Sequence, residues 1–177
     1  MEKKLTPKIN IGILLLGILI SLFFNVFTFK KLYSAPKYVN KIALGACITQ
    51  EKKQPIWKSI LKERSDIFIF MGDNVYGDDR VTGKLDKLSN AYKKQKTKVP
   101  FTKLEKTNEV YAIWDDHDYG KNDGGADYQY KKEAKNLFLD FWNISLNDPR
   151  RNREGIYFET KKVTKKGLLQ IIFLDTR

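Results

Sequence analysis

The stretch IFIFMGDNVYGDD, residues 67–79, decides the fold class. Its first five residues form a continuous apolar run without polar alternation, which is typical of a central strand that is buried on both faces. A short apolar run at residues 41–46 precedes it, and residues 54–64, which begin Gln-Pro-Ile, indicate a helix between the two runs. Strand, helix and strand in this order predict a right-handed crossover and a parallel pair. The sequence therefore predicts an α/β fold.

A second decisive stretch, residues 113–125 (IWDDHDYGKNDGG), crowds four aspartates around His117, the only histidine of the chain. The apolar run at residues 110–114 leads into it and predicts a strand, so the acidic group would lie at the carboxyl end of that strand, where α/β folds place their chemistry. Carboxylates at this density repel one another unless a cation, a partner or open solvent stabilises them. The segment is either a polar site or a very exposed loop.

The remaining soluble part predicts further helices and strands. We expect a helix at residues 84–92, a break at Pro100, and a helix over residues 130–141 whose apolar stripe belongs to the core rather than to an aromatic binding box. Residues 155–160 and 168–174 are predicted strands joined by a basic turn at residues 165–167.

The N-terminal region predicts a membrane-targeting segment. Residues 11–29 are almost wholly apolar and are long enough for the ~30 Å hydrocarbon core of a bilayer, whereas the apolar part of a cleaved signal spans only about 7–15 residues. This favours an uncleaved transmembrane signal anchor after a basic N-terminus at residues 1–10, over a cleaved signal or a buried core helix. Residues 30–40 form a linker, and residues 41–177 form one domain. Lysines on both flanks specify the orientation only weakly.

Composition alone does not identify the binding partners of the protein. The 177 residues carry a formal net charge of +12, which suits a polyanion, a phosphorylated substrate or an anionic membrane surface, although a solvated basic face explains it equally well. The lysine-rich residues 93–98 are interpreted as such a solvated face. A single cysteine excludes an intrachain disulfide.

Groups able to bind a metal follow three predicted strands. They are Cys47 after the first, Asp73 and Tyr76 after the second, and Asp115, Asp116 and His117 after the third. Each group alone is weak evidence for a metal site, since a lone cysteine is often a small buried residue and Gly-Asp often makes a turn. Parallel strands align their carboxyl ends, so these groups would converge. Such oxygen-rich ligation favours a hard cation and argues against a structural zinc site.

The same motifs resemble those of the PhoD-like alkaline phosphatases, a branch of the metallophosphatases. The resemblance spans residues 42–177 in order and rests on GACIT (45–49), FMGDNVYGD (70–78), WDDHDYGKNDGG (114–125), GIY (155–157) and LDTR (174–177). It implies a metallophosphatase-like sandwich of mixed β-sheets flanked by helices, incomplete here and preceded by the transmembrane helix.

The resemblance also implies roles for single residues. Cys47, Asp73 and Tyr76 would ligate a ferric iron, with Asp73 bridging to calcium. Asp116 would face the second metal, and His117 would contact the phosphoryl group and assist the leaving oxygen. Asp115, Asp118 and Asp123 are expected to structure the loop or to lie outside the metal ligands.

Two departures from the family pattern stand out. Ala46 replaces a serine, which we expect to matter little, and the chain ends directly after LDTR, before the family's remaining ligands. We therefore expect a fragment or a truncated relative with about half of the binuclear site. The expected function is hydrolysis of phosphate esters by metal-activated hydroxide, in a membrane-anchored, extracytoplasmic domain that meets nucleic acid only as a substrate. The alternative is a non-catalytic, membrane-tethered polyanion-binding protein.

Overall fold

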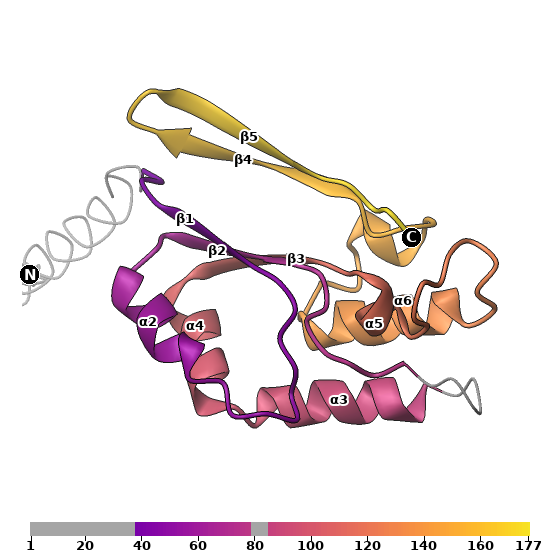
Figure 1. Ribbon diagram of the computed structural model, residues 1–177. Coiled ribbons are helices and arrows are strands. Elements are labelled where there is room, and N and C mark those ends of the chain that lie inside the picture. Colours follow the sequence, from indigo (N-terminus) through magenta and orange to yellow (C-terminus); the bar gives the residue numbers. More distant parts are fainter. Residues whose placement is uncertain (1–37, 79–84) are drawn as a thin grey trace, which may run out of the picture. The chain divides into compact units, whose positions relative to one another are not determined.

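The computed structural model describes residues 38–78 and 85–177 (Figure 1). The predicted basic N-terminus, the signal anchor at residues 11–29 and nearly all of the linker at residues 30–40 lie outside the described residues. Within the described part of the chain, no helix is both long enough and apolar enough to cross a membrane.

A parallel sheet of three strands positions the predicted site. It consists of β1 (Ile42–Gly45), β2 (Ile67–Met71) and β3 (Glu109–Ile113), with β2 in the middle. Gly45, Phe70 and Ala112 occupy one row of the sheet, so the three carboxyl ends lie level. The first four residues of β2 are buried, which confirms the prediction of a central strand covered on both faces.

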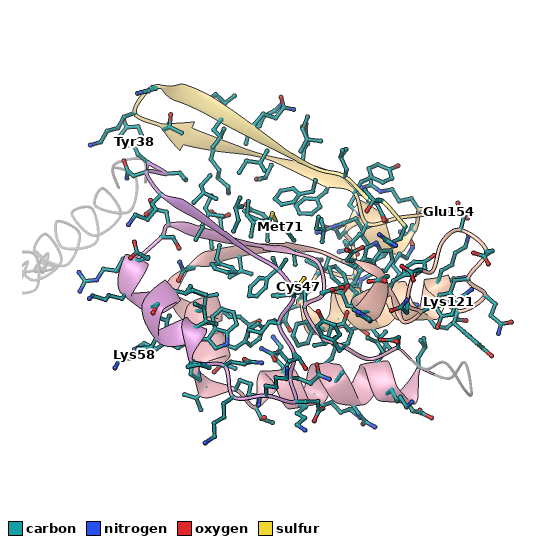
Figure 2. All side chains as sticks on the ribbon, viewed as in Figure 1. Tyr38, Cys47, Lys58, Met71, Lys121 and Glu154 are labelled. Carbon is teal, nitrogen blue, oxygen red and sulfur yellow. The ribbon has the colours of Figure 1, made fainter. Side chains whose placement is uncertain are left out.

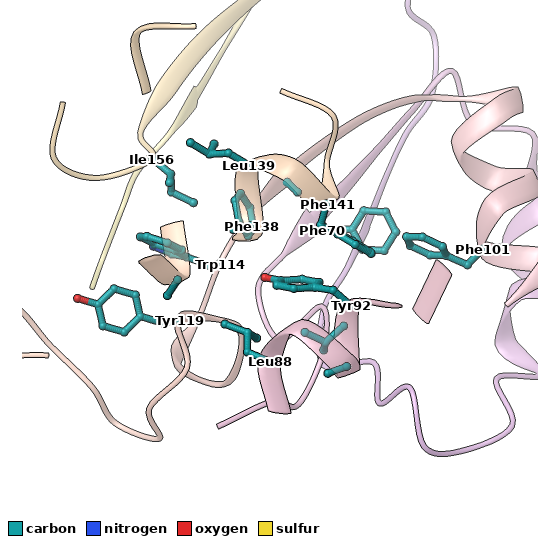
Figure 3. Close-up of a cluster of buried hydrophobic side chains, with 14 of the residues drawn as sticks. Phe70, Leu88, Tyr92, Phe101, Trp114, Tyr119, Phe138, Leu139, Phe141 and Ile156 are labelled. Carbon is teal, nitrogen blue, oxygen red and sulfur yellow. The ribbon is translucent and has the colours of Figure 1, made fainter. Parts of the chain in front are cut away.

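Helices cover one face of this sheet. They are α2 (Ile56–Glu63) between β1 and β2, α3 (Asp86–Lys96) and α4 (Val99–Thr107) between β2 and β3, and α6 (Lys131–Phe141) after β3. Phe68 and Phe70 of β2 face a core that includes Trp57, Phe101 and the α6 residues Ala134, Phe138 and Phe141. Figure 3 shows several of these rings together. The stripe on α6 is therefore part of the core, as predicted.

A β-hairpin covers the other face. Its strands β4 (Phe158–Thr164) and β5 (Gly167–Phe173) pair antiparallel. Phe173 packs with Ile67 and Ile69 of β2, whose side chains alternate with those that face the helices. On β3, the Tyr111 hydroxyl lies 3.1 Å from the Thr160 Oγ1 of β4. The domain is a mixed α/β fold with parallel and antiparallel sheets, the helices on one side of the parallel sheet and the hairpin on the other (Figure 1).

Some predicted elements are wrong in their details. Pro100 does not break a helix but lies in the first turn of α4, where its missing N–H leaves no intrahelical bond unmade. The strand predicted at residues 155–160 is Phe158–Thr164, because the Ile156 N–H donates to Asp175 rather than to a neighbouring strand. The predicted helix at residues 84–92 extends to Lys96 as α3, and Pro149–Arg151 form a 3₁₀ turn that was not predicted.

Candidate metal centre

The backbone at the ends of β1 and β2 adopts two tight left-handed turns. Cys47 has a φ of 59° and Asp73 a φ of 50°. Their segments are tied together, since the Cys47 N–H donates to the Gly72 carbonyl at 3.2 Å and the Ile48 N–H donates to the Asp73 carbonyl at 2.9 Å. Left-handed backbone is costly for a cysteine and often marks a functional position. These turns place both side chains at the carboxyl edge of the sheet.

The Asp73 carboxylate is the meeting point of the side chains. Its Oδ2 accepts hydrogen bonds from the Cys47 thiol at 3.6 Å and from the Tyr76 hydroxyl at 3.2 Å. Its Oδ1 is buried and has no hydrogen-bond partner among the described residues, although Asp73 is only 8% exposed. A buried carboxylate oxygen without a donor is energetically costly, and a cation is one of the partners that would satisfy it.

Two further ligand groups reach the same place from the other side. Asp73, Asp116 and His117 each offer one ligand atom, and these atoms lie within 4.8 Å of one another. The Tyr76 ring lies against the His117 ring, with 4.3 Å between their centroids. The fold thus brings together all five predicted site residues, Cys47, Asp73, Tyr76, Asp116 and His117; we call them the strand-end cluster. Figure 2 labels Cys47 where the strands end.

The thiol and the phenol of the cluster are held in their neutral forms. Burial, followed by the negative charge of Asp73, raises the pKa of Cys47, and the same two causes raise that of Tyr76 well above its ordinary value. Cys47 as a whole residue is exposed. It therefore differs from the small buried cysteine that is common at a strand end. A bound cation inverts this balance, because it favours thiolate and phenolate over their protonated forms.

A carboxylate that the sequence did not single out orients the histidine. Asp78 Oδ1 accepts a hydrogen bond from His117 Nδ1 at 2.6 Å, which leaves Nε2 as the nitrogen that can exchange a proton. Burial acts to lower the pKa of His117, but the hydrogen bond to Asp78 and the charges of Asp78, Asp116 and Asp73 outweigh it and raise the pKa above its ordinary value. The imidazole is thus biased towards its protonated form.

Asp116 is fixed by the loop that follows it. The Asp123 N–H donates to Asp116 Oδ2 at 2.8 Å, from a residue that itself has a φ of 53°. Burial acts to raise the pKa of Asp116, but the Asp123 amide and the nearby His117 lower it overall. Asp116 therefore stays ionised. Asp123 acts through its backbone, in keeping with the expected loop-structuring role.

Asp118 joins the segments that follow the second and third strands. The short helix α5 (Asp116–Tyr119) begins with a capping box, in which the Asp115 N–H donates to Asp118 Oδ1 at 2.6 Å. Asp118 Oδ2 accepts from the backbone N–H of Asn74 at 3.1 Å and from its side-chain amide. Burial raises the pKa of Asp118 to about 8, against the N–H donors of Asp115 and Asn74. The residue is structural, as expected.

The LDTR motif turns back onto the third strand. Asp175 accepts hydrogen bonds from the Trp114 indole at 2.7 Å, the Ile156 N–H at 2.7 Å and the Arg177 N–H at 3.1 Å. The Arg177 guanidinium pairs with Asp115 Oδ1 at 2.6 Å. These contacts connect the GIY and LDTR motifs to the residues that precede Asp116, a link that neither motif reveals by itself.

The cluster fits a cation by its chemistry. It offers two carboxylates, a phenol, a thiol and an imidazole, and such an oxygen-rich set suits a hard cation without selecting iron or calcium. Comparison of the chain with protein-family models, with curated proteins and with solved structures finds no match in any of the three.

Proposed function

We propose that the domain is a metal-dependent phosphoric ester hydrolase. The observation that carries this proposal is the buried Asp73 carboxylate, one oxygen of which has no hydrogen-bond partner among the described residues while the other accepts from Cys47 and Tyr76. Asp73 lies within reach of Asp116 and His117. Perturbed ionisable groups that converge at the carboxyl edge of an α/β sheet are a recurrent feature of active sites.

Asp73 and Asp116 would hold the cation, with the Cys47 thiolate and the Tyr76 phenolate as further ligands. When bound, such a cation supplies Lewis-acid stabilisation of phosphoryl oxygens and a water of lowered pKa as the nucleophile. We propose ferric iron and calcium as the metals, on the resemblance to the PhoD-like phosphatases alone.

His117 would act on the leaving group. Its Nδ1 is occupied by Asp78, so Nε2 carries the proton that the departing alkoxide needs. The neighbouring carboxylates raise the pKa of His117, so the imidazolium is populated near neutral pH. Asp78 is a positioning residue in this scheme, because it fixes the ring and the tautomer without touching the substrate.

The setting of the enzyme is part of the proposal. Membership of the PhoD-like family accounts for the order of the five motifs along residues 42–177. The apolar residues 11–29 would anchor the domain at the membrane, on the extracytoplasmic side.

The test is metal analysis of the full chain combined with assays on p-nitrophenyl phosphate and bis-p-nitrophenyl phosphate, with added iron and calcium. We expect bound metal in the wild type and its loss in Asp73→Asn. Asp127→Asn is the matched control, since Asp127 is exposed and contacts Lys121 rather than the cluster. A wild type that binds no metal contradicts the proposal. A wild type that binds metal without hydrolysis supports the cation site and refutes the hydrolase.

A second candidate, a membrane-tethered polyanion-binding protein without turnover, is favoured by the net charge of +12. It predicts polyanion binding that weakens steeply with added salt and is indifferent to Asp73→Ala and His117→Ala. Loss of binding in either variant excludes it.

A further inference from the structure

A basic cavity of about 620 Å³ lies beside the C-terminal end of the hairpin. Its charged lining comprises six cationic and two acidic side chains: Lys131, Lys132, Lys135, Arg151, Arg153, Arg177, Glu154 and Asp175. Glu154, labelled in Figure 2, marks this edge of the molecule. No member of the strand-end cluster lines the cavity, so the two sites are distinct.

The three lysines of the cavity lie in an unfavourable place for positive charge. Lys131 and Lys132 belong to the first turn of α6, where the helix dipole is positive and cations are destabilising, and Lys135 lies in the next turn. Lys131 and Lys135 are also four residues apart, a spacing that sets like charges against each other. Such a concentration of positive charge lowers folding stability, and an anion placed there would relieve it.

Lys135 shows this cost most clearly. It is only 8% exposed, and the acceptor that its ammonium contacts is the Arg153 carbonyl at 2.5 Å, not a carboxylate. Burial, followed by the charge of Lys132 and then those of Arg151 and Arg153, lowers the pKa of Lys135, although Glu154 acts in the opposite direction. A buried ammonium beside other cations is stabilised by a nearby anion.

The arginines are only partly neutralised. Arg151 pairs with Asp140 at 2.6 Å and Arg177 with Asp115 at 2.6 Å, while the Arg153 guanidinium stacks on the Tyr157 ring at 3.9 Å. In the part of the chain that the structure describes, the Nε atoms of all three arginines are buried without a hydrogen-bond acceptor. The oxygens of Asp175 are already used by N–H donors, so this acid contributes little further neutralisation.

We propose that this cavity binds a small molecule with two or more adjacent phosphate groups. Several ammonium and guanidinium groups around one space are the donors that phosphate oxygens prefer, and guanidinium binds them in pairs. The volume is in the range of small-molecule sites and exceeds what a single phosphate fills. The site is independent of the proposed hydrolase and stands or falls separately from it.

The test is calorimetric titration of the full chain with sodium tripolyphosphate, with EDTA present so that no metal occupies the cluster. Lys132→Ala is the first variant, because Lys132 is exposed and its loss does not threaten folding. Removing one charged donor weakens binding about tenfold. Lys135→Met, checked for folding by circular dichroism, is expected to weaken binding at least as much.

Two control variants test whether tripolyphosphate binds in this cavity rather than elsewhere on the protein. Lys161→Ala removes the same charge from the exposed side of the hairpin and is expected to leave the affinity unchanged. Asp116→Asn alters the strand-end cluster, and it is also expected to leave the affinity for tripolyphosphate unchanged. The proposal is overturned if the wild type does not bind tripolyphosphate, if Lys132→Ala and Lys161→Ala weaken binding equally, or if Asp116→Asn abolishes binding.

Discussion

His117 Nδ1 and Asp78 Oδ1 lie 2.6 Å apart, and this contact joins the last residue of the FMGDNVYGD motif, which follows β2, to the only histidine of the chain. Because the pKa of His117 is raised, the ion pair stabilises the folded state most below pH 6.5, and the gain is lost as the pH rises through the raised pKa. Asp78→Asn should lower the pKa of His117.

The measurement is straightforward, since a single histidine gives a single imidazole resonance. Its titration by NMR in the presence of EDTA should shift to lower pH in Asp78→Asn and stay in place in Asp127→Asn. If the wild type turns over phosphate esters, Asp78→Asn should slow it about 10- to 100-fold. An unchanged titration would show that Asp78 does not hold the ring in solution.

Gly72→Ala should damage the strand ends. Gly72 has a φ of +106°, and a Cβ there would lie 2.6 Å from the Asp115 Cβ and 2.9 Å from its backbone nitrogen. We expect a loss of about 3 kcal/mol or more in the free energy of unfolding, measured with urea. Gly167→Ala is the matched control, because Gly167 also has a positive φ but faces open space. It should cost only about 1 kcal/mol, and equal losses would mean that the close approach to Asp115 is unimportant.

Asp148→Asn should destabilise the domain in a pH-dependent way. Hydrogen bonds from the Arg150 guanidinium lower the pKa of Asp148 to about 2, against the opposing effect of burial. The carboxylate therefore stabilises the fold above its unfolded pKa of about 3.9, and this stabilisation is lost as the pH falls towards 2.

At pH 7 the loss in Asp148→Asn should be on the order of 1–2 kcal/mol, and it should shrink between pH 5 and pH 2. Asp140→Asn is the control. Asp140 pairs with Arg151 but is more exposed than Asp148, so its replacement should cost under about 0.5 kcal/mol. A loss that stays constant with pH would assign the effect of Asp148 to packing rather than to charge.

Asp175→Ala should loosen the contact between the LDTR segment and the third strand. Three N–H donors, those of Trp114, Ile156 and Arg177, would lose their acceptor, and the first two belong to buried residues. We expect about 3 kcal/mol of destabilisation in urea unfolding followed by tryptophan fluorescence. Asp175→Asn keeps the shape and one acceptor, so it should lose less. If the two variants unfold alike, the hydrogen bonds are not the reason for the loss.

The strands of the parallel sheet could be predicted from the sequence because burial on both faces leaves a continuous apolar run, as in β2. The helix α4 could not, since a proline is compatible both with a break and with a first helical turn, and Pro100 occupies the latter. The hairpin was predicted from its turn, but the start of β4 depends on the contact of Ile156 with Asp175, which is distant in sequence.

The convergence of the strand-end cluster could be predicted because its members lie within five residues of the end of an apolar strand, and the register of the sheet brings strand ends together. Asp78 was missed because it lies seven residues beyond β2 and reaches His117 only through the path of the loop. Asp175 was missed for a similar reason, since its partners Trp114 and Ile156 come from two other segments. Roles that depend on such loop paths need the structure.

The left-handed turns at Cys47 and Asp73 have a consequence for ligand binding. Their strain and the ordering of their side chains are met when the chain folds, so a cation at the proposed site would find its donors already in place and would lose little affinity to reorganisation. The same preorganisation makes the two positions intolerant of β-branched residues, which disfavour such a backbone. If the sequence of the strands changed, these two turns would therefore be the part of the site that changed least.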